Sequence, residues 1–308
     1  MLIHLLTFSN PQKINSLTQN ELDLLRVAAQ KQGHQLVVIF AKDCQMKFDR
    51  KPSLLIKNHE HKKINVVIVR ANFLTNIEFK NSLIRQFELA GIKVVNRSIA
   101  VRRAKNKLNT VQILTEAKIP VPKTYIVNHA EYLDDVINDI GRFPVILKTT
   151  TGSHGSGVSI IESRRGLKSI IDMITKNRDS EPLIIQEYVK ESKGKDLRVF
   201  IIKKRIIGAM ERIATKKGEF RSNFHLGGRV RVATLSPEEK KIAFKAVAAC
   251  GLDFAGVDII RTNSGPKILE VNANPGLEGI TLATGRDIAG EIIKYAVKKA
   301  SLSKKNKK

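Results

Sequence analysis

The side chains best suited to chemistry gather in one segment, residues 256–279. Asp258 lies in one apolar run, while Glu270 and Asn272 lie in the next, two residues apart and therefore on one face of a strand. Residues 263–266, Asn-Ser-Gly-Pro, predict a tight turn, and folding the hairpin about it places Asp258 opposite Glu270. Two carboxylates and an amide oxygen suit a hard cation, Mg²⁺ or Mn²⁺, bound together with phosphate oxygens. The alternative is an ordinary hairpin with a polar outer face.

A glycine-rich loop, residues 151–157, follows an apolar strand that ends at Lys148. Glycines allow backbone N–H groups to turn toward a phosphate, and a nearby lysine supplies a point charge. No Gly-Lys-Ser/Thr follows, and the spacing does not match a dinucleotide fingerprint. The loop therefore indicates phosphate binding only together with the distant carboxylates, and a plain hairpin turn is the alternative.

A further apolar strand turns polar along residues 185–190, Ile-Gln-Glu-Tyr-Val-Lys. Such an edge can hydrogen-bond a purine through its backbone, and Asp196 just beyond it could take ribose hydroxyls. A plain linker between two domains is the better explanation of this local pattern taken alone.

The composition is that of a folded protein without membrane segments. The 308 residues are 42% hydrophobic, which is enough for a sizeable core and two or three subdomains. The first residues lack the basic start and cleavage site of a secretory signal, and no apolar run is long enough to span a bilayer. Cys44 and Cys250 have neither metal-ligand nor redox spacing, so we expect reduced thiols in a cytoplasmic protein with no membrane partner.

The net charge is +25, from 54 Lys and Arg against 29 Asp and Glu. A field of this sign attracts anions such as a nucleotide, an acidic peptide, RNA or the ribosome. A lysine-rich codon bias that only decorates the surface is the competing explanation. No acidic residue follows Glu291, and residues 301–308 are predicted to form a disordered basic tail.

The order of elements predicts an α/β (α+β) protein. Residues 1 to about 95 alternate strands with helices, which indicates a small domain with a mainly parallel sheet. Its first helix is expected to open at a Thr18-x-x-Glu21 capping box, and a basic helix is expected over 100–118. Later strands near 198–202 and 206–210 are expected to pair through a short turn.

Several motifs together resemble the ATP-grasp ligases, and within them the RimK group. The resemblance rests on residues 97–108, 145–148, the glycine loop, 186–188, 196–198, 220–223, 227–228, 255–258 and 270–279. It covers nearly the whole chain, although Thr151 and the His-Gly-Ser-Gly of 154–157 depart from the family's usual loop. It implies an ATP-grasp fold with an N-terminal small parallel-sheet α/β domain at 1–97, a central lid subdomain at 98–185, a C-terminal antiparallel-sheet subdomain at 186–300 and the basic tail at 301–308.

The resemblance also implies a role for each matching residue. Lys107 and Lys148 would hold the ATP phosphates. Glu187 and Tyr188 would contact adenine, and Asp196 would bind the ribose. Arg221, Ser222 and Asn223 would line the region of the γ-phosphate and the acceptor. Two Mg²⁺ or Mn²⁺ ions would be bound by Asp258, Glu270 and Asn272. Lys148 and Arg221 would be catalytic, because they offset charge on the transferring phosphoryl group.

The implied activity is that of an ATP-dependent carboxylate–amine ligase that adds L-glutamate to the C-terminus of an acceptor, first of all ribosomal protein S6. ATP would phosphorylate the acceptor carboxylate, and the amine of glutamate would displace phosphate, leaving ADP and phosphate as products. The sequence does not specify the acceptor, the number of glutamates added, the regulation, the general base or whether the chain forms a homo-oligomer.

Two alternatives stay open. One is a related ligase that joins glutamate or another amino acid to a small coenzyme or carrier protein, and it would share every ATP-binding residue. The other is a non-catalytic RNA-binding protein. This last reading has less support, because aromatic residues make up only 5% of the chain and no RNA-binding motif appears.

Overall fold

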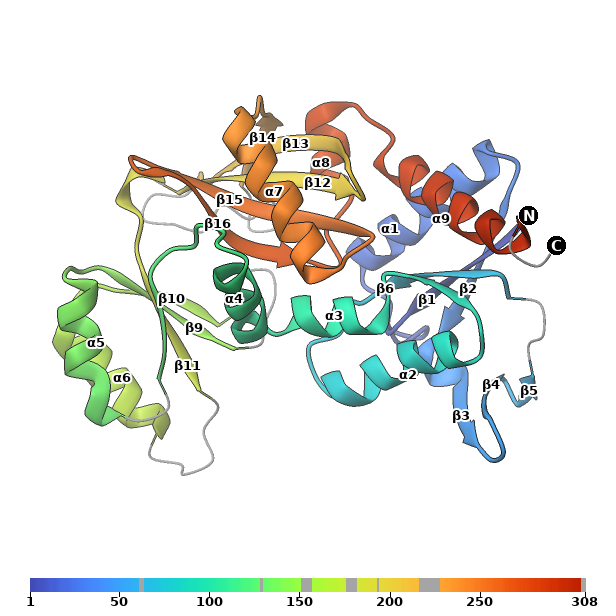
Figure 1. Ribbon diagram of the computed structural model, residues 1–308, viewed down its shortest axis with the longest axis horizontal. Coiled ribbons are helices and arrows are strands. Elements are labelled where there is room, and N and C mark those ends of the chain that lie inside the picture. The colour runs from blue at the N-terminus through green and yellow to red at the C-terminus, as the bar shows by residue number, and fades with distance from the viewer. Residues whose placement is uncertain are drawn as a thin grey trace.

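A computed structural model describes residues 1–305 apart from 61–63, 128–129, 151–156, 176–181, 193 and 216–227. Three sheets follow one another along the long axis of the molecule (Figure 1). We call them the amino-terminal, central and carboxyl-terminal sheets. The expected ATP-grasp architecture, with a parallel first sheet and antiparallel sheets after it, is confirmed.

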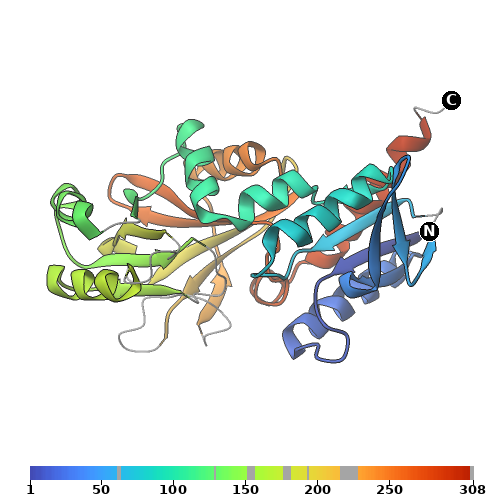
Figure 2. The same ribbon diagram turned by 90° about the horizontal axis from the view of Figure 1, so that it is seen from below.

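The amino-terminal sheet is parallel and has the strand order β2-β1-β6-β7. Its members are β1 (Leu2–Thr7), β2 (Gln35–Phe40), β6 (Val66–Arg70) and β7 (Lys93–Val95). Alternating apolar side chains fill both faces: α1 (Ser16–Lys31) and α9 (Ile288–Lys305) cover one, and α2 (Ile77–Leu89) covers the other. Figure 2 shows α1 and α2 on opposite sides of these strands. A small antiparallel sheet of β3 (Cys44–Phe48), β4 (Pro52–Ile56) and β5 (His59–Glu60) lies between β2 and β6 in the chain.

The central sheet is antiparallel, with the order β10-β9-β11-β8. It comprises β8 (Thr124–Val127), β9 (Val145–Thr149), β10 (Val158–Ile161) and β11 (Leu183–Glu187). Helices α5 (Leu133–Ile140) and α6 (Arg164–Thr175) pack on one side of it. Their apolar residues form a core of their own, separate from the rest of the molecule. The central sheet is therefore a unit that can move against the others.

The carboxyl-terminal sheet is antiparallel, with the order β14-β13-β12-β15-β16. Its strands are β12 (Lys195–Ile202), β13 (Arg205–Ile213), β14 (Arg229–Val232), β15 (Phe254–Thr262) and β16 (Gly265–Asn272). Helix α7 (Pro237–Cys250) packs on one face, and α8 (Glu278–Thr284) and α9 pack on the other. Both apolar clusters continue into the amino-terminal domain, so the first and third sheets share one scaffold. Short 3₁₀ turns occupy Ala41–Asp43, Ala130–Tyr132 and Lys190–Ser192.

Two helix boundaries differ from expectation. Helix α1 begins at Ser16, because Asn15 Oδ1 accepts from the backbone N–H of Thr18 at 2.8 Å, so the predicted capping box at Thr18 is wrong. The predicted basic helix is two helices, α3 (Ser98–Lys105) and α4 (Lys107–Glu116). Asn106 has an extended backbone and caps the second through a 3.1 Å bond from Asn109 N.

The end of the chain is also more ordered than the sequence suggests. Helix α9 continues to Lys305, so the disorder expected from residue 301 is wrong for 301–305, and residues 306–308 lie outside the described part. The domain bounds given above stay predictions. Within the described residues, no helix combines the length and the apolarity that a bilayer crossing demands.

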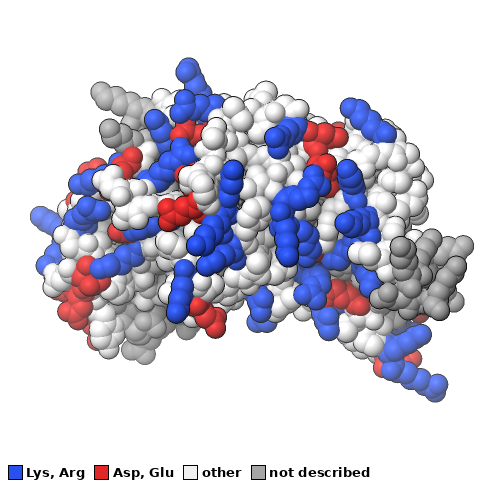
Figure 3. Space-filling view, turned by 45° about the horizontal axis from the view of Figure 1, so that its top comes forward, with Lys and Arg blue, Asp and Glu red and all other residues white. Residues whose placement is uncertain are grey.

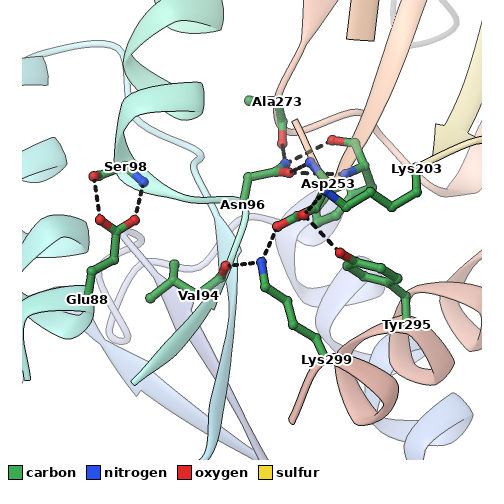
Figure 4. A network of polar contacts seen from close by, with 10 residues as sticks. Glu88, Val94, Asn96, Ser98, Lys203, Asp253, Ala273, Tyr295 and Lys299 are labelled. Carbon is green, nitrogen blue, oxygen red and sulfur yellow. Dashed lines mark hydrogen bonds and ion pairs between the residues drawn. The ribbon is translucent and has the colours of Figure 1, made fainter. Parts of the chain in front are cut away.

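Asn96, just after β7, joins the first domain to the carboxyl-terminal sheet (Figure 4). Its Nδ2 donates to the carbonyls of Phe254 at 2.9 Å and Ala273 at 3.1 Å. Its Oδ1 accepts from the N–H groups of Asp253 at 2.6 Å and Phe254 at 3.0 Å. The side chain is fully buried, so all four bonds replace contacts with water.

Replacing Asn96 with Ala should therefore lower the free energy of unfolding by about 3 kcal/mol or more, because several buried backbone groups lose their partners. Chemical denaturation measures this change. Asn65→Ala is the matched control, since Asn65 is exposed, and it should change stability by less than about 0.5 kcal/mol. Equal losses in the two variants would contradict the assignment.

Candidate active site

The hairpin of β15 and β16 has the predicted register. Asp258 pairs with Glu270, and Gly256 pairs with Asn272, so the three polar side chains share one face and one end of the sheet. Figure 1 shows both strands at the border with the central sheet. The geometric prediction is confirmed, while the metal-binding role of the three residues stays a prediction.

Asp258 is held by two arginines that the sequence reading gave no role. Nε and Nη2 of Arg198, on β12, donate to its two oxygens at 2.5 and 2.7 Å, and Nη2 of Arg212, on β13, lies 2.9 Å from Oδ2. All three side chains are nearly buried. Burial opposes ionisation of the carboxyl, but the two guanidinium groups hold the pKa of Asp258 below its ordinary value. Asp258 is therefore charged and fixed in place.

Asp196 continues this row of charges. It accepts two bonds from Arg212, at 2.7 Å from Nε and 2.6 Å from Nη2. Arg212 thus bridges Asp196 and Asp258 across three neighbouring strands. The ribose-binding role of Asp196 stays a prediction, and a ligand hydroxyl there would share the carboxylate with Arg212.

Lys148 approaches the carboxylates from the central sheet. It lies on β9 and is half-buried, and its Nζ donates to Gln186 Oε1 at 2.7 Å. Burial lowers its pKa to about 8; the charges of Glu270 and Asp258 act in the opposite direction, and that of Lys107 adds to the lowering. This coupling shows that Lys148, Lys107, Glu270 and Asp258 belong to one electrostatic site. The backbone N–H of Lys107 also donates to Thr150 O at 3.1 Å, which fixes the start of α4 beside the end of β9.

Glu187 connects the two antiparallel sheets. Its Oε1 accepts from the backbone N–H of Lys123 at 3.0 Å and from Lys267 Nζ, on β16, at 2.5 Å. The backbone N–H of Glu187 donates to Lys123 O at 2.9 Å. Tyr188 follows directly and is half-buried. Both residues therefore lie where the central sheet meets the carboxyl-terminal sheet, and their place at an adenine hinge stays a prediction.

Part of the predicted site falls outside the described residues. This applies to Arg221, Ser222 and Asn223, and to residues 151–156 of the glycine loop.

Sequence reasoning missed Arg198, Arg212 and Lys105. The first two interrupt apolar strands at alternate positions, and that signal could have placed them on the same face as Asp196. Their convergence on Asp258 required the strand order, which brings Arg198 close to a residue 60 positions further along the chain and joins Arg212 to the same carboxylate.

The donor set fits a hard cation. Glu270 accepts no hydrogen bond from the described side chains, and Asn272 uses its Nδ2 to reach Asp258 Oδ2 at 3.4 Å, which leaves its amide oxygen available. Both oxygens of Asp258 are engaged by arginines, so Glu270 and Asn272 are the readier donors. No cluster of three or more His, Cys, Asp or Glu side chains in the described part is arranged to hold a metal. Phosphate or water oxygens must therefore complete the shell.

Gly256 lies where two parts of the site approach each other closely. A Cβ at this position would lie 2.7 Å from Cβ of Pro275 and 2.9 Å from Cδ of Arg198. No side chain fits between them, so the absence of one allows Pro275 to pack against the arginine that holds Asp258.

Two facing antiparallel sheets, one carrying a half-buried lysine and the other a row of acids, are the arrangement of the ATP-grasp enzymes. The chain superposes on the ATP-grasp ligase PsnB complexed with its minimal precursor with a TM-score of 0.74, at 18% identity, covering 96% of this chain and 98% of that one. It superposes on the D-alanine–D-alanine ligase of Bacillus anthracis, complexed with ATP, with a TM-score of 0.71 at 18% identity over 100% of both chains. These likenesses establish the fold.

Sequence similarity identifies the family within the ATP-grasp enzymes. Residues 104–296 match the RimK-like ATP-grasp domain, and residues 13–101 match the RimK PreATP-grasp domain. A probable alpha-L-glutamate ligase of Vibrio parahaemolyticus is 37% identical over 277 residues, 90% of this chain and 91% of the relative. Probable alpha-L-glutamate ligase 1 of Shewanella denitrificans is 38% identical over 279 residues, 90% of this chain and 93% of the relative. The chain belongs to the RimK family of ATP-grasp ligases, and it is an enzyme that forms amide bonds with the use of ATP.

The lowered pKa of Lys148 predicts that nucleotide affinity falls at alkaline pH. Above about pH 8 the free enzyme loses the ammonium charge, so the Kd for ATP with Mg²⁺ should rise, by at most about tenfold per pH unit. Titrations between about pH 7 and 9.5 measure it. Lys148→Arg keeps its charge over this range and should flatten the profile. An unchanged profile in Lys148→Arg would assign the effect to another group.

Proposed function

We propose that this protein adds L-glutamate to the C-terminal carboxyl group of a peptide or protein acceptor through an acyl phosphate, with ribosomal protein S6 as the first acceptor to test. The observation that carries the proposal is the match to probable alpha-L-glutamate ligases along 90% of this chain and 91 to 93% of the relatives. The site geometry supports it, because phosphate-binding cations and carboxylates face each other from two sheets.

The roles proposed for the site residues follow from their charges. Lys148 and Lys107 would bind ATP phosphates, and Arg221 would add a further cation at the transferring group. Asp258, Glu270 and Asn272 would hold Mg²⁺ or Mn²⁺, which neutralises phosphate charge and polarises the phosphoryl group when bound. Asp258 is already neutralised by Arg198 and Arg212, so Glu270 supplies the uncompensated negative charge of the set.

The acceptor carboxylate would attack the γ-phosphorus, ADP would leave, and the amine of glutamate would then displace phosphate from the acyl carbon. The protein's share is positioning and exclusion of water from the reactive anhydride. The separate core of the central sheet suits a lid that closes for this purpose.

A peptide acceptor is favoured over a small coenzyme by the fold neighbours. PsnB and the macrocyclase MdnC were solved with precursor peptides bound. The basic surface accords with an acidic acceptor or with RNA, but it is not concentrated. Figure 3 shows Lys and Arg spread over the whole visible face with Asp and Glu between them. Contact with the ribosome or RNA is therefore a secondary part of the proposal.

Glu270→Gln should lower kcat for glutamate ligation by about a hundredfold or more, because the exchange removes the uncompensated carboxylate at the metal and phosphate site. The assay is mass spectrometry of acceptor products with ATP, Mg²⁺ and L-glutamate. Glu60→Gln, an exposed exchange in the small sheet, is the control and should be silent. Near-normal turnover in Glu270→Gln, with an unchanged melting temperature, would sink the assignment.

The acyl-phosphate route predicts ADP and phosphate as products. If the acceptor carboxylate carries a heavy oxygen isotope, one labelled oxygen should appear in the released phosphate, since that oxygen bridges carbon and phosphorus in the intermediate. Phosphorus NMR reads the label. AMP and pyrophosphate, or phosphate without label during productive ligation, would rule the route out.

A further inference from the structure

The amino-terminal sheet has a reversal of strand order that faces the site. From β1 the chain adds β2 on one side and then returns to add β6 on the other side of β1. In open parallel sheets, ligands bind beyond the carboxyl ends of the strands at such a reversal. Here that edge carries Thr7 and Arg70, the last residues of β1 and β6.

Arg70 has donors that no group in the described part of the chain uses. Its side chain is 3% exposed. Nη2 donates to Glu21 Oε2 at 2.6 Å and to Pro275 O at 3.1 Å, while Nε and Nη1 are buried without a partner. Unpaired buried donors on a charged group are rare and costly, and a bound anion would satisfy both.

Further cations lie beside Arg70. The ammonium groups of Lys105 and Lys80 lie 5.1 and 5.7 Å from the centre of the Phe73 ring. Burial lowers the pKa of Lys105 to about 8, the charge of Glu270 opposes this, and Arg70 adds to the lowering. Lys105 is therefore within electrostatic range of both Arg70 and Glu270, and among the described residues Glu21 is the acid that pairs with Arg70.

A buried acceptor lies on the segment that Arg70 touches. Asn274 Oδ1 has no hydrogen-bond partner, and Asn274 directly precedes Pro275, whose carbonyl accepts from Arg70. Unsatisfied donors and an unsatisfied acceptor thus occur on adjoining groups at the same edge. A free amino acid, which carries a carboxylate and an ammonium group on one carbon, has the chemistry to satisfy both.

We propose that Arg70 and Lys105 bind a carboxylate of the incoming amino acid at the reversal between β1 and β6, with Asn274 available to its amino group. The proposal rests on the proposed ligase function and adds where the amino acid lies. Its amine would then approach the phosphate site from the side of Glu270. Entry requires the groups that cover Arg70 to move, because its side chain is only 3% exposed.

Calorimetric titration tests this assignment. L-glutamate is titrated into the full-length enzyme loaded with Mg²⁺ and a non-hydrolysable ATP analogue, and then a panel of other amino acids is titrated. Arg70→Met and Lys105→Met should each weaken amino-acid binding by about tenfold or more, because each removes a charge-assisted hydrogen bond. Affinity for the ATP analogue should change less than about threefold. Arg102→Met is the matched control on the same helix as Lys105, since its ion pair with Glu78 is exposed, and it should bind as the wild type does.

The possible outcomes distinguish a failure of the proposed amino-acid site from a failure of the proposed ligase function. Unchanged amino-acid affinity in both Met variants overturns the site, even if glutamate is ligated. The site is also overturned if the Met variants raise only the KM for a peptide acceptor, because Arg70 and Lys105 would then bind the acceptor and not the amino acid. If the wild type binds another amino acid and Arg70 is needed for it, the site stands and the glutamate assignment fails. Binding of no amino acid by the wild type overturns both. If Arg70→Met does not fold, Lys105→Met, which leaves the Arg70 bonds to Glu21 and Pro275 intact, decides.

Discussion

The site depends on the neutralisation of Asp258. A carboxylate buried among strands is unstable alone, and Arg198 and Arg212 supply the two charges that let it stay ionised there. Because Arg212 also holds Asp196, one chain of ion pairs fixes the relative positions of β12, β13 and β15. Removing Arg212 would leave Asp196 without its ion pair, and removing Asp258 would leave Arg198 without its ion pair, so the row depends most on these two inner members. Glu270, at its end, is the carboxylate left for ligand chemistry.

The three sheets differ in how firmly they are joined to one another. The amino-terminal and carboxyl-terminal sheets share two apolar cores, and Asn96 joins them through four buried bonds. The central sheet has its own core and meets the hairpin through polar contacts: Lys267 reaches Glu187, and the N–H of Ile268 donates to Pro120 O at 2.8 Å. Shared apolar cores and the bonds of Asn96 thus join the first and third sheets, while polar contacts join the central sheet to the hairpin.

Much of this could be predicted from the sequence. The parallel first sheet follows from its apolar runs, and the pairing of Asp258 with Glu270 follows from the turn and the two-residue period of a strand. The arginines around Asp258 could not be derived this way, because their partners are set by the order of strands rather than by spacing along the chain. The break at Asn106 was missed because helical periodicity continues across it, while its capping bond to Asn109 appears only in three dimensions. Arg70 gave no signal at all, since a basic residue at the end of a strand is commonplace.

Gly256 has a consequence for how the chain tolerates change. The space a methyl group would need is already filled by Arg198 on one side and Pro275 on the other. Arg198 belongs to the ion pairs of Asp258, and Pro275 accepts from Arg70. Because Arg198 and Pro275 both lie against the backbone of Gly256, a shift of one of them would also disturb the other. Any side chain at position 256 would have to displace Pro275 or Arg198, so this glycine contributes by its small size, which keeps the two groups of charged residues in place.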